Sequence, residues 1–412
     1  MSGTMNIPGS DDSTDALNAL VDRIGRRAWQ ARMAELKRGC GPSYAGRALG
    51  QLHALELTIE RLRRPGRTMP VSALDRRVIA LAAELAGLAD GFTAAGRARL
   101  DAALAQAVTG TGNLVPLFHV IRTASIQRSR GFAVAFAGLD EGAPFDLLID
   151  RQGAEAEIVC DVISAEDGRD LHRRAWSQLM DRVDPDLQSW LAAHPGRYLL
   201  KMTLPQGLKG ADAADAAPPL AELHRRITRL LSEQKRADHD EAAILRLDPL
   251  MLAAAQATDA KQAQPGLLPR LRREFGPEAH LAVTAAGSGV FVMAARAGRE
   301  DEVAGAVHRR MAGIAPARLT GSRPGILAMF IEDTDRLEWH LLRDQLRLEG
   351  EARQFMTRPE ARAVVAVTCS SRLELLGPDE VEGAPCAELR FRNPSHPDAR
   401  KAALAPAVVS SP

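Results

Sequence analysis

The sequence predicts a mixed α/β protein, with an α-helical N-terminal domain followed by α/β segments. Over residues 14–111, apolar residues recur at intervals of three and four, the period of amphipathic helices. After residue 112, apolar runs of strand length appear between glycine-containing turns. Hydrophobic residues make up 46% of the chain and charged residues 25%, as expected for a globular protein.

Two apolar stripes define the helical domain. They consist of Leu52, Leu55, Ile59 and Leu62, and of Leu74, Val78, Leu81, Leu85 and Leu88. A proline-glycine turn at 63–67 separates them. Each stripe needs a covering partner, which is the other stripe, the next domain or a second copy of the chain. We therefore keep a homo-oligomer formed through these helices as one prediction. Residues 1–13 and 400–412 are predicted to be loose tails.

Residues 112–204 predict the element order α-β-β-β-α-β. A helix over 114–130 precedes strands at 132–136, 145–149 and 155–163. A helix over 168–193 follows, with a break expected at Asp184-Pro185, and then a strand over 197–204.

The rest of the chain predicts a linker at 205–219 and an α/β C-terminal portion over 220–399. Strand-like runs occur at 242–247, 280–285, 289–295, 325–331 and 363–368, and helices are expected at 300–313 and 335–350. The sequence leaves open whether this portion shares a sheet with residues 112–204.

Charge, cysteine content and apolar stretches indicate which kinds of partner the protein could bind. The formal net charge is +1, so a nucleic-acid surface would have to be a local basic patch. The four cysteines form no CxxC pair, which argues against a structural zinc site. No apolar stretch is long enough to cross a bilayer and no leader peptide is recognisable. We expect a cytoplasmic protein with no membrane partner.

The segment 114–204 resembles bacterial proteins of the PD-(D/E)xK nuclease-like superfamily. The run Leu117-Phe118-His119-Val120-Ile121-Arg122 is similar to the first helix of that fold. Phe145-Asp146-Leu147-Leu148 resembles its Asp-bearing strand, and residues 157–169 resemble the acid-x-Lys strand with the turn after it. A weaker similarity lies at 390–394. The resemblance implies a restriction-endonuclease-like αβββαβ core over about 112–204, with an α/β C-terminal extension.

The chemistry of that family requires clustered oxygen ligands. Hydrolysis of a phosphodiester uses one or two Mg²⁺ ions held by carboxylates, with a lysine near the attacking water. Residues i and i+2 of a strand point the same way, about 6.6 Å apart. An acid-x-Lys pair therefore places both groups beside the Asp of the neighbouring strand.

This sequence departs from the family pattern. With Asp146 in the first acid position, the residues in register for acid and lysine are Val159 and Asp161. The helix position that often carries Glu is Val120. The resemblance therefore implies nuclease ancestry with a damaged metal motif.

A rebuilt site remains an alternative. Asp146 with Asp161, or Asp146 with Glu157, would hold Mg²⁺, and a cation would come from Arg169, His172 or Arg173. In this alternative the catalytic residues are Asp146, Glu157, Asp161 and Arg173, and Asp146 and Asp161 bind the metal. The structural alternative makes Asp146 a turn residue and pairs Asp161 with Arg169 or Arg173 at a sheet edge.

Four arginines are candidate nucleic-acid contacts: Arg122, Arg128, Arg130 and Arg169. Three functional hypotheses follow. The first is a non-catalytic or weakly catalytic nuclease-derived protein associated with DNA or RNA. The second is an active Mg²⁺-dependent endonuclease with relocated residues. The third is a non-catalytic scaffold that assembles through its N-terminal helices.

Overall fold

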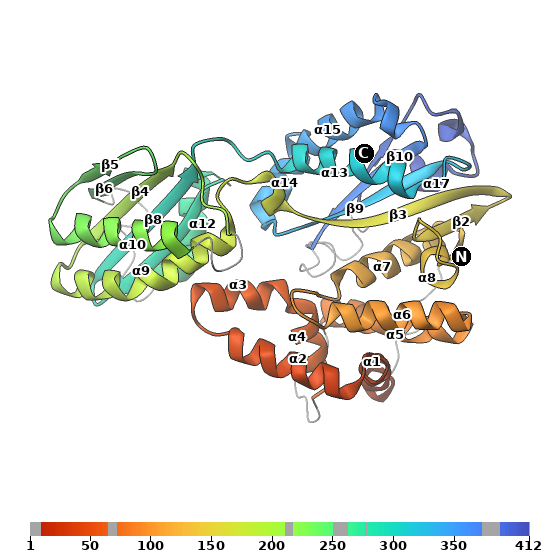
Figure 1. The fold of residues 1–412 in the computed structure, drawn as a ribbon, viewed down its shortest axis with the longest axis horizontal. Helices are drawn as coiled ribbons and strands as arrows, with labels where there is room; N and C mark the ends of the chain where they lie inside the picture. The colour runs from red at the N-terminus through yellow and green to blue at the C-terminus, as the bar shows by residue number, and fades with distance from the viewer. Residues whose placement is uncertain are drawn as a thin grey trace. The chain divides into compact units, whose positions relative to one another are not determined.

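The computed structural model describes residues 10–64, 72–210, 217–249, 263–276, 278–372 and 388–411. The chain forms two compact units, each containing helices and strands (Figure 1). Unit 1 comprises Met1–Gly39, Gly50–Ala165 and Ala304–Pro412, and unit 2 comprises Cys40–Leu49 and Glu166–Val303. The predicted mixed α/β class is confirmed. Unit 2 thus interrupts unit 1 in the sequence.

The N-terminal helices of unit 1 are α1 (Ser10–Ile24), α2 (Arg26–Gly39), α4 (Ala54–Leu62), α5 (Ala73–Gly91) and α6 (Ala94–Ala107), and α3 (Tyr44–Leu52) is shared between the units. Ser72 caps α5 in a reciprocal capping box with Asp75, and Thr93 caps α6. Most residues of the predicted stripes are buried within the unit, with Ile59 and Leu85 fully covered, while Leu52, Leu74 and Leu88 are half-buried. Helix α1 begins at Ser10, inside the segment predicted to be a loose tail.

The sheet of unit 1 has six strands in the order β1-β2-β3-β9-β10-β11. Their bounds are β1 (Ala133–Ala135), β2 (Leu147–Arg151), β3 (Ala154–Ser164), β9 (Gly325–Glu332), β10 (Val364–Ser371) and β11 (Leu389–Arg392). Strands β3, β9 and β10 are parallel, and the outer pairings are antiparallel. The predicted hairpin turn between β2 and β3 forms at 152–153 with positive φ at Gln152 and Gly153.

Helices cover both faces of this sheet. Helix α7 (Val115–Ser129) lies on one face, and α13 (Val303–Arg318) and α15 (Arg347–Met356) lie on the other (Figure 1). Because strand residues alternate in direction, Cys160 faces α7 while Asp161 faces α13. Smaller helices complete the unit: α8 (Ala137–Asp140), α14 (Arg336–Asp344) and α17 (Ala405–Val408).

One strand of the predicted core lies elsewhere. The predicted strand over 197–204 forms as β4 (Arg197–Leu204), but it belongs to the sheet of unit 2. The predicted helix over 168–193 also lies in unit 2, as α9 (Arg173–Ala193), which continues through Pro185 without the expected break. The parallel neighbour of β3 is β9, which follows α13. Short apolar runs predict strands but do not specify their pairing, because pairing depends on tertiary contacts.

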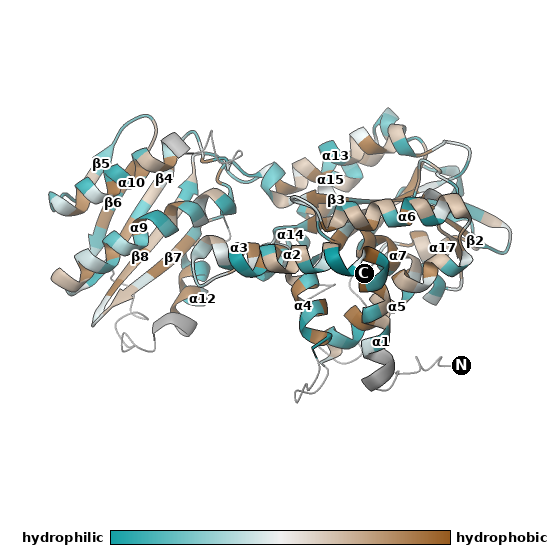
Figure 2. Cartoon of the chain, turned by 60° about the horizontal axis from the view of Figure 1, so that its bottom comes forward, coloured by the Kyte–Doolittle hydropathy of each residue, from teal (hydrophilic) through white to brown (hydrophobic). Residues whose placement is uncertain are grey.

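Unit 2 is built on a five-stranded sheet in the order β5-β6-β4-β8-β7. The remaining strands are β5 (Ala237–His239), β6 (Ile244–Pro249), β7 (His280–Ala286) and β8 (Gly289–Ala297). Helices α9 and α10 (Ala217–Ser232) pack over one apolar cluster, and α12 (Ala263–Phe275) contacts β7 beside a smaller one. Figure 2 shows hydrophilic and hydrophobic residues alternating along these covering helices. Of the predicted linker 205–219, residues 211–216 lie outside the described residues, and α10 begins at Ala217.

The C-terminal segment is not the predicted loose tail. Leu404, Ala407 and Val408 are fully buried around α17. The hydroxyls of Ser410 and Ser411 accept hydrogen bonds from backbone amides of β11. This segment belongs to the packed part of unit 1. Among the described residues, none of the helices has the length and apolar character needed to cross a membrane.

Candidate functional site

Asp146 lies immediately before β2, next to the strand that carries Val159. Its amide donates to the Ile158 carbonyl at 2.9 Å. Its carboxylate accepts from the Cys160 amide at 2.7 Å and from Arg318 Nη2 at 2.9 Å. Burial raises the pKa of the Asp146 carboxyl above its ordinary value, and the Arg318 guanidinium opposes part of that rise. Both carboxylate oxygens therefore already have protein donors.

Glu157 is fully buried near the start of β3. Its carboxylate accepts from the Thr320 amide at 2.9 Å and from the Thr320 hydroxyl. Arg323 approaches the same carboxylate, with Nη1 at 3.8 Å. Glu157 thus fixes the turn that connects α13 to β9.

Asp161 forms a two-point ion pair with Arg310 of α13. Arg310 Nε and Nη2 donate to the carboxylate at 2.6 and 2.8 Å. The sequence predicted Arg169 or Arg173 as the partner, and that prediction is wrong. Both of those arginines belong to unit 2, where Arg169 pairs with Glu166 and Asp301. The Arg173 amide donates to the Glu166 carboxylate.

The partners of the three acids come from α13 and the turn after it. Arg310, Arg318 and Thr320 were not identified from the sequence, because they follow β3 by about 150 residues and form no local motif with it. Among the described residues, no group of three or more His, Cys, Asp or Glu side chains is arranged to hold a metal ion. The two predicted Mg²⁺ ligands, Asp146 and Asp161, each bind an arginine of α13 in this structure. Val159 between them is fully buried.

The candidate arginines of α7 have individual environments. Arg128 pairs with Glu84 and lies over the Phe136 ring, 5.4 Å from its centroid. Arg130 donates to Glu388 at 3.0 Å. Arg122 is 5% exposed, and its Nη2 atom has no hydrogen-bond partner in the structure. These three side chains do not form one exposed basic stripe.

The layer between α7 and the sheet contains a buried histidine and a buried thiol. His119 donates through Nε2 to the Ala328 carbonyl at 2.9 Å. Burial lowers the pKa of His119 to about 4. Burial also raises the pKa of the Cys160 thiol well above its ordinary value, so this thiol is not a nucleophile of the activated kind.

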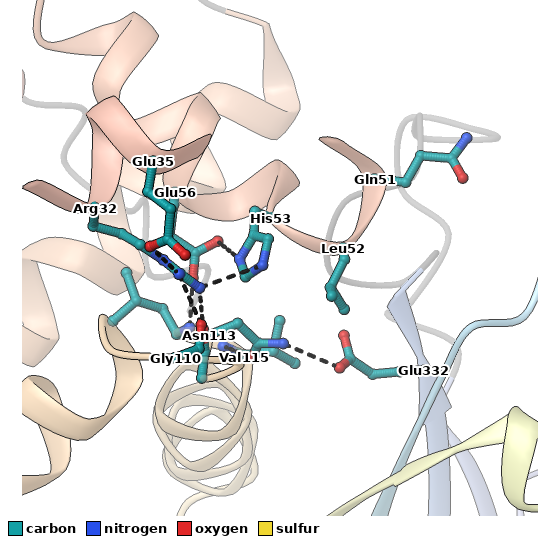
Figure 3. Close-up of polar contacts among 12 residues, drawn as sticks. Arg32, Glu35, Gln51, Leu52, His53, Glu56, Gly110, Asn113, Val115 and Glu332 are labelled. Carbon is teal, nitrogen blue, oxygen red and sulfur yellow. Dashed lines mark hydrogen bonds and ion pairs between the residues drawn. The ribbon is translucent and has the colours of Figure 1, made fainter. Parts of the chain in front are cut away.

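A second buried polar cluster joins α2 and α4 to the start of α7 (Figure 3). Arg32 donates to the carbonyls of Gly110 and Gly112 at 2.8 and 2.7 Å and to His53 Nε2 at 3.3 Å. Glu56 is fully buried, and its Oε1 accepts from the Leu114 amide at 2.6 Å. The free oxygen of Glu56 lies 3.7 Å from His53 Nδ1. The cluster fixes the loop that begins α7.

The carboxyl ends of β9 and β10 carry a further ion pair. Arg372 donates to Glu332. The second oxygen of Glu332 accepts from Asn113 Nδ2 at 3.4 Å (Figure 3). Arg372 also donates to the carbonyls of Gln51 and Leu52 at the end of α3. Burial raises the pKa of the Glu332 carboxyl. These contacts attach the N-terminal helices to the carboxyl ends of β9 and β10.

Comparisons of the chain with protein-family models, with curated proteins and with solved structures find no match.

Proposed function

We propose that this chain is a nuclease-derived protein that does not hydrolyse phosphodiester bonds and that associates with DNA or RNA. The order of elements in unit 1 supports the proposal. Helix α7 leads into the antiparallel strands β1, β2 and β3, and helix α13 then leads into β9, parallel to β3. This is the α-β-β-β-α-β order that the resemblance implies, with unit 2 inserted before the second helix.

The observation that carries the loss of catalysis is the pairing of the three acids. Asp146, Glu157 and Asp161 each direct their carboxylate oxygens to separate protein donors. Magnesium requires oxygen ligands at about 2.1 Å in near-octahedral geometry, so these bonds would have to break before it could bind. The arginines supply permanent positive charge where a metal would otherwise lie, and they cannot act as bases at neutral pH.

The alternative of an active enzyme with relocated residues is less consistent with this geometry. It required Asp146 to converge with Asp161 or Glu157 around one ion, with a cation from the helix after Gly168. The described residues hold no group of three or more His, Cys, Asp or Glu side chains that could bind a metal ion, and that helix belongs to unit 2.

The scaffold alternative also receives no support from the stripes that suggested it. Leu55, Ile59, Val78 and Leu85 are fully buried within unit 1. Self-assembly through those residues would require unit 1 to open.

Two measurements on the full chain test the proposal. The first is cleavage of single- and double-stranded DNA and RNA with Mg²⁺ or with EDTA. We expect no EDTA-sensitive cleavage by the wild type and the same background for Asp146→Ala. Robust EDTA-sensitive cleavage that Asp146→Ala abolishes would refute the loss of catalysis.

The second measurement is fluorescence anisotropy with labelled oligonucleotides at low and moderate salt. We expect binding that weakens as salt rises, because phosphate contacts release counterions. An absence of binding to every oligonucleotide at low salt would refute the nucleic-acid association.

A further inference from the structure

Two arginines lie beside one buried carboxylate on the α7 face of the first sheet. Arg130 follows the last residue of α7, and its Nη2 donates to Glu388 at 3.0 Å. Glu388 immediately precedes β11, and Arg390 lies two residues later in the chain. In an extended chain such residues point to the same side, about 6.6 Å apart. Arg390 donates through Nη1 to the Pro406 carbonyl at 2.8 Å.

Both guanidinium groups retain unused hydrogen-bond donors. Arg130 Nη1 and Arg390 Nε are buried and have no hydrogen-bond partner in the structure. A buried N–H without an acceptor costs free energy, and a charged one costs more than a neutral one. Burial and the nearby Arg130 together lower the pKa of the Arg390 guanidinium, as expected where positive charge is incompletely compensated.

A third arginine lies beside the residue that follows Arg130. Arg151 ends β2 and donates through Nη1 to the Ala403 carbonyl at 3.2 Å. Its Nε lies 3.7 Å from the point where a Cβ would stand on Gly131, the residue after Arg130. Among the described residues, the Arg130–Glu388 contact is the only ion pair that these three arginines form. The Glu388 carboxylate therefore lies near the guanidinium groups of Arg130 and Arg390.

We propose that Arg130 and Arg390 form a binding site for one phosphate-type oxyanion beyond the C-terminal end of α7. The planar fork of a guanidinium matches two oxygens of a phosphate, and several such forks satisfy one tetrahedral anion. When no anion is bound, Glu388 holds Arg130 in place. The negative charge of Glu388 repels a bound anion and competes with it for Arg130. The side chain of Arg130 is 17% exposed, so the site communicates with solvent.

The phosphate group has two possible sources: the backbone of a nucleic acid, or free phosphate and small phosphorylated molecules. Only the first source rests on the nucleic-acid association proposed above. The site itself depends on the arginines alone, so separate probes distinguish the two.

The test uses the full-length chain and isothermal titration with inorganic phosphate at constant ionic strength. Arg130→Gln and Arg390→Gln each remove one fork, and we expect each to weaken phosphate binding about tenfold or more. Glu388→Gln removes the competing charge, and we expect it to tighten binding several-fold. Arg128→Gln is the matched control, because Arg128 lies on the same helix but pairs with Glu84. We expect it to leave phosphate affinity unchanged.

The outcomes are decisive in both directions. Weaker binding by the two arginine variants together with tighter binding by Glu388→Gln supports the site. Absence of phosphate binding by the wild type, or equal affinity in the wild type and both arginine variants, overturns it. A Glu388→Gln affinity no higher than that of the wild type also overturns it, and this variant adds no bulk, which limits the risk of misfolding.

A parallel titration with a short oligonucleotide assigns the source. If the arginine variants weaken phosphate and oligonucleotide binding alike, the nucleic-acid backbone supplies the group. If phosphate binds and the oligonucleotide does not, the site stands and the nucleic-acid function fails. Oligonucleotide binding that is insensitive to the arginine variants, with no phosphate binding, leaves the proposed function intact and overturns the site.

Discussion

His119 illustrates how one side chain links the fold to pH. Its imidazole lies between α7 and the sheet, where Nε2 donates to a β9 carbonyl and Nδ1 has no hydrogen-bond partner in the structure. This arrangement requires the neutral ring, because protonation would bury an unpaired charge. The lowered pKa of His119, about 4, follows from that environment.

The lowered pKa predicts a loss of stability in acid. Between pH 6.5 and about 4 the unfolded histidine binds a proton that the folded one does not, so stability falls as pH falls through this window. The contribution reaches up to about 3 kcal/mol. Urea unfolding at several pH values measures it. His119→Gln keeps an amide donor for Ala328 and removes the titration, so its stability should depend less on pH. An identical pH profile for both proteins would contradict this assignment.

At the residue scale, the sequence identified Asp146, Glu157 and Asp161 but not what they contact. The turn at 152–153 sets a register in which Asp146 lies opposite Val159, two residues from Glu157 and from Asp161 along β3. Their partners lie far along the chain. The residues around an arginine on an amphipathic helix do not indicate which distant acid it will pair with. The burial of Arg122 could not be predicted from the sequence either, since arginine is usually exposed.

At the element scale, helix α13 is held on the sheet by acids of β3 and of the turn before β2. Arg310 donates to Asp161, and Arg318 donates to Asp146. In the turn after α13, the Thr320 amide donates to Glu157. Positions that the family resemblance assigns to chemistry thus serve to attach a helix. The sequence predicted both the helix and the strands. It did not predict that α13 packs on β3, because unit 2 separates these two elements in the sequence.

A double-mutant cycle measures the strength of that attachment. Asp161→Asn and Arg310→Gln, alone and combined, should give a coupling free energy of about 1 kcal/mol, reduced from a buried pair because Arg310 is 51% exposed. Chemical denaturation of the four proteins provides the values. The exposed pair Glu349–Arg353 on α15 is the control, and its coupling should be smaller. Equal coupling in both cycles would show that the α13 contact has no special structural role.

The start of α7 depends on a carboxylate from another helix. Glu56 accepts the Leu114 amide at the position where a helix leaves its first amides without partners (Figure 3). We expect Glu56→Ala to lower the free energy of unfolding by about 2 kcal/mol, because the buried Leu114 amide loses its acceptor. Glu35→Ala is the control, since Glu35 pairs with Arg32 of the same cluster but is 56% exposed. If the two substitutions cost the same, the capping role is wrong.

At the scale of the whole molecule, the longer segment of unit 2, Glu166–Val303, begins and ends at one place. The Glu302 amide donates to the Gly168 carbonyl at 2.7 Å, and Gly168 lies directly against Val303. Residues 40–49 join unit 2, where the amides of Tyr44 and Ala45 donate to the Asp181 carboxylate. Apolar periodicity predicted most of the individual elements, but it could not separate two sheets whose strands have similar composition.

The adjacency of these ends predicts that unit 1 folds without the insertion. Replacing residues 169–301 by a short Gly-Ser linker should leave one cooperative thermal transition and protected amides in β3 and β9, measured by calorimetry and hydrogen exchange. Extending the deletion through residue 318 removes Arg310 and Arg318 and should abolish that transition. Loss of cooperative unfolding in the shorter deletion would show that the units are interdependent.

The pairing of β3 with β9 also has a consequence for synthesis of the protein. About 160 residues separate the end of β3 from the start of β9. During synthesis, β9 is therefore completed on the order of ten to thirty seconds after β3. Unit 2 has time to fold during this delay. The apolar edge of β3 meanwhile has no partner and is available to other nascent chains. Such non-local pairing also slows refolding from denaturant.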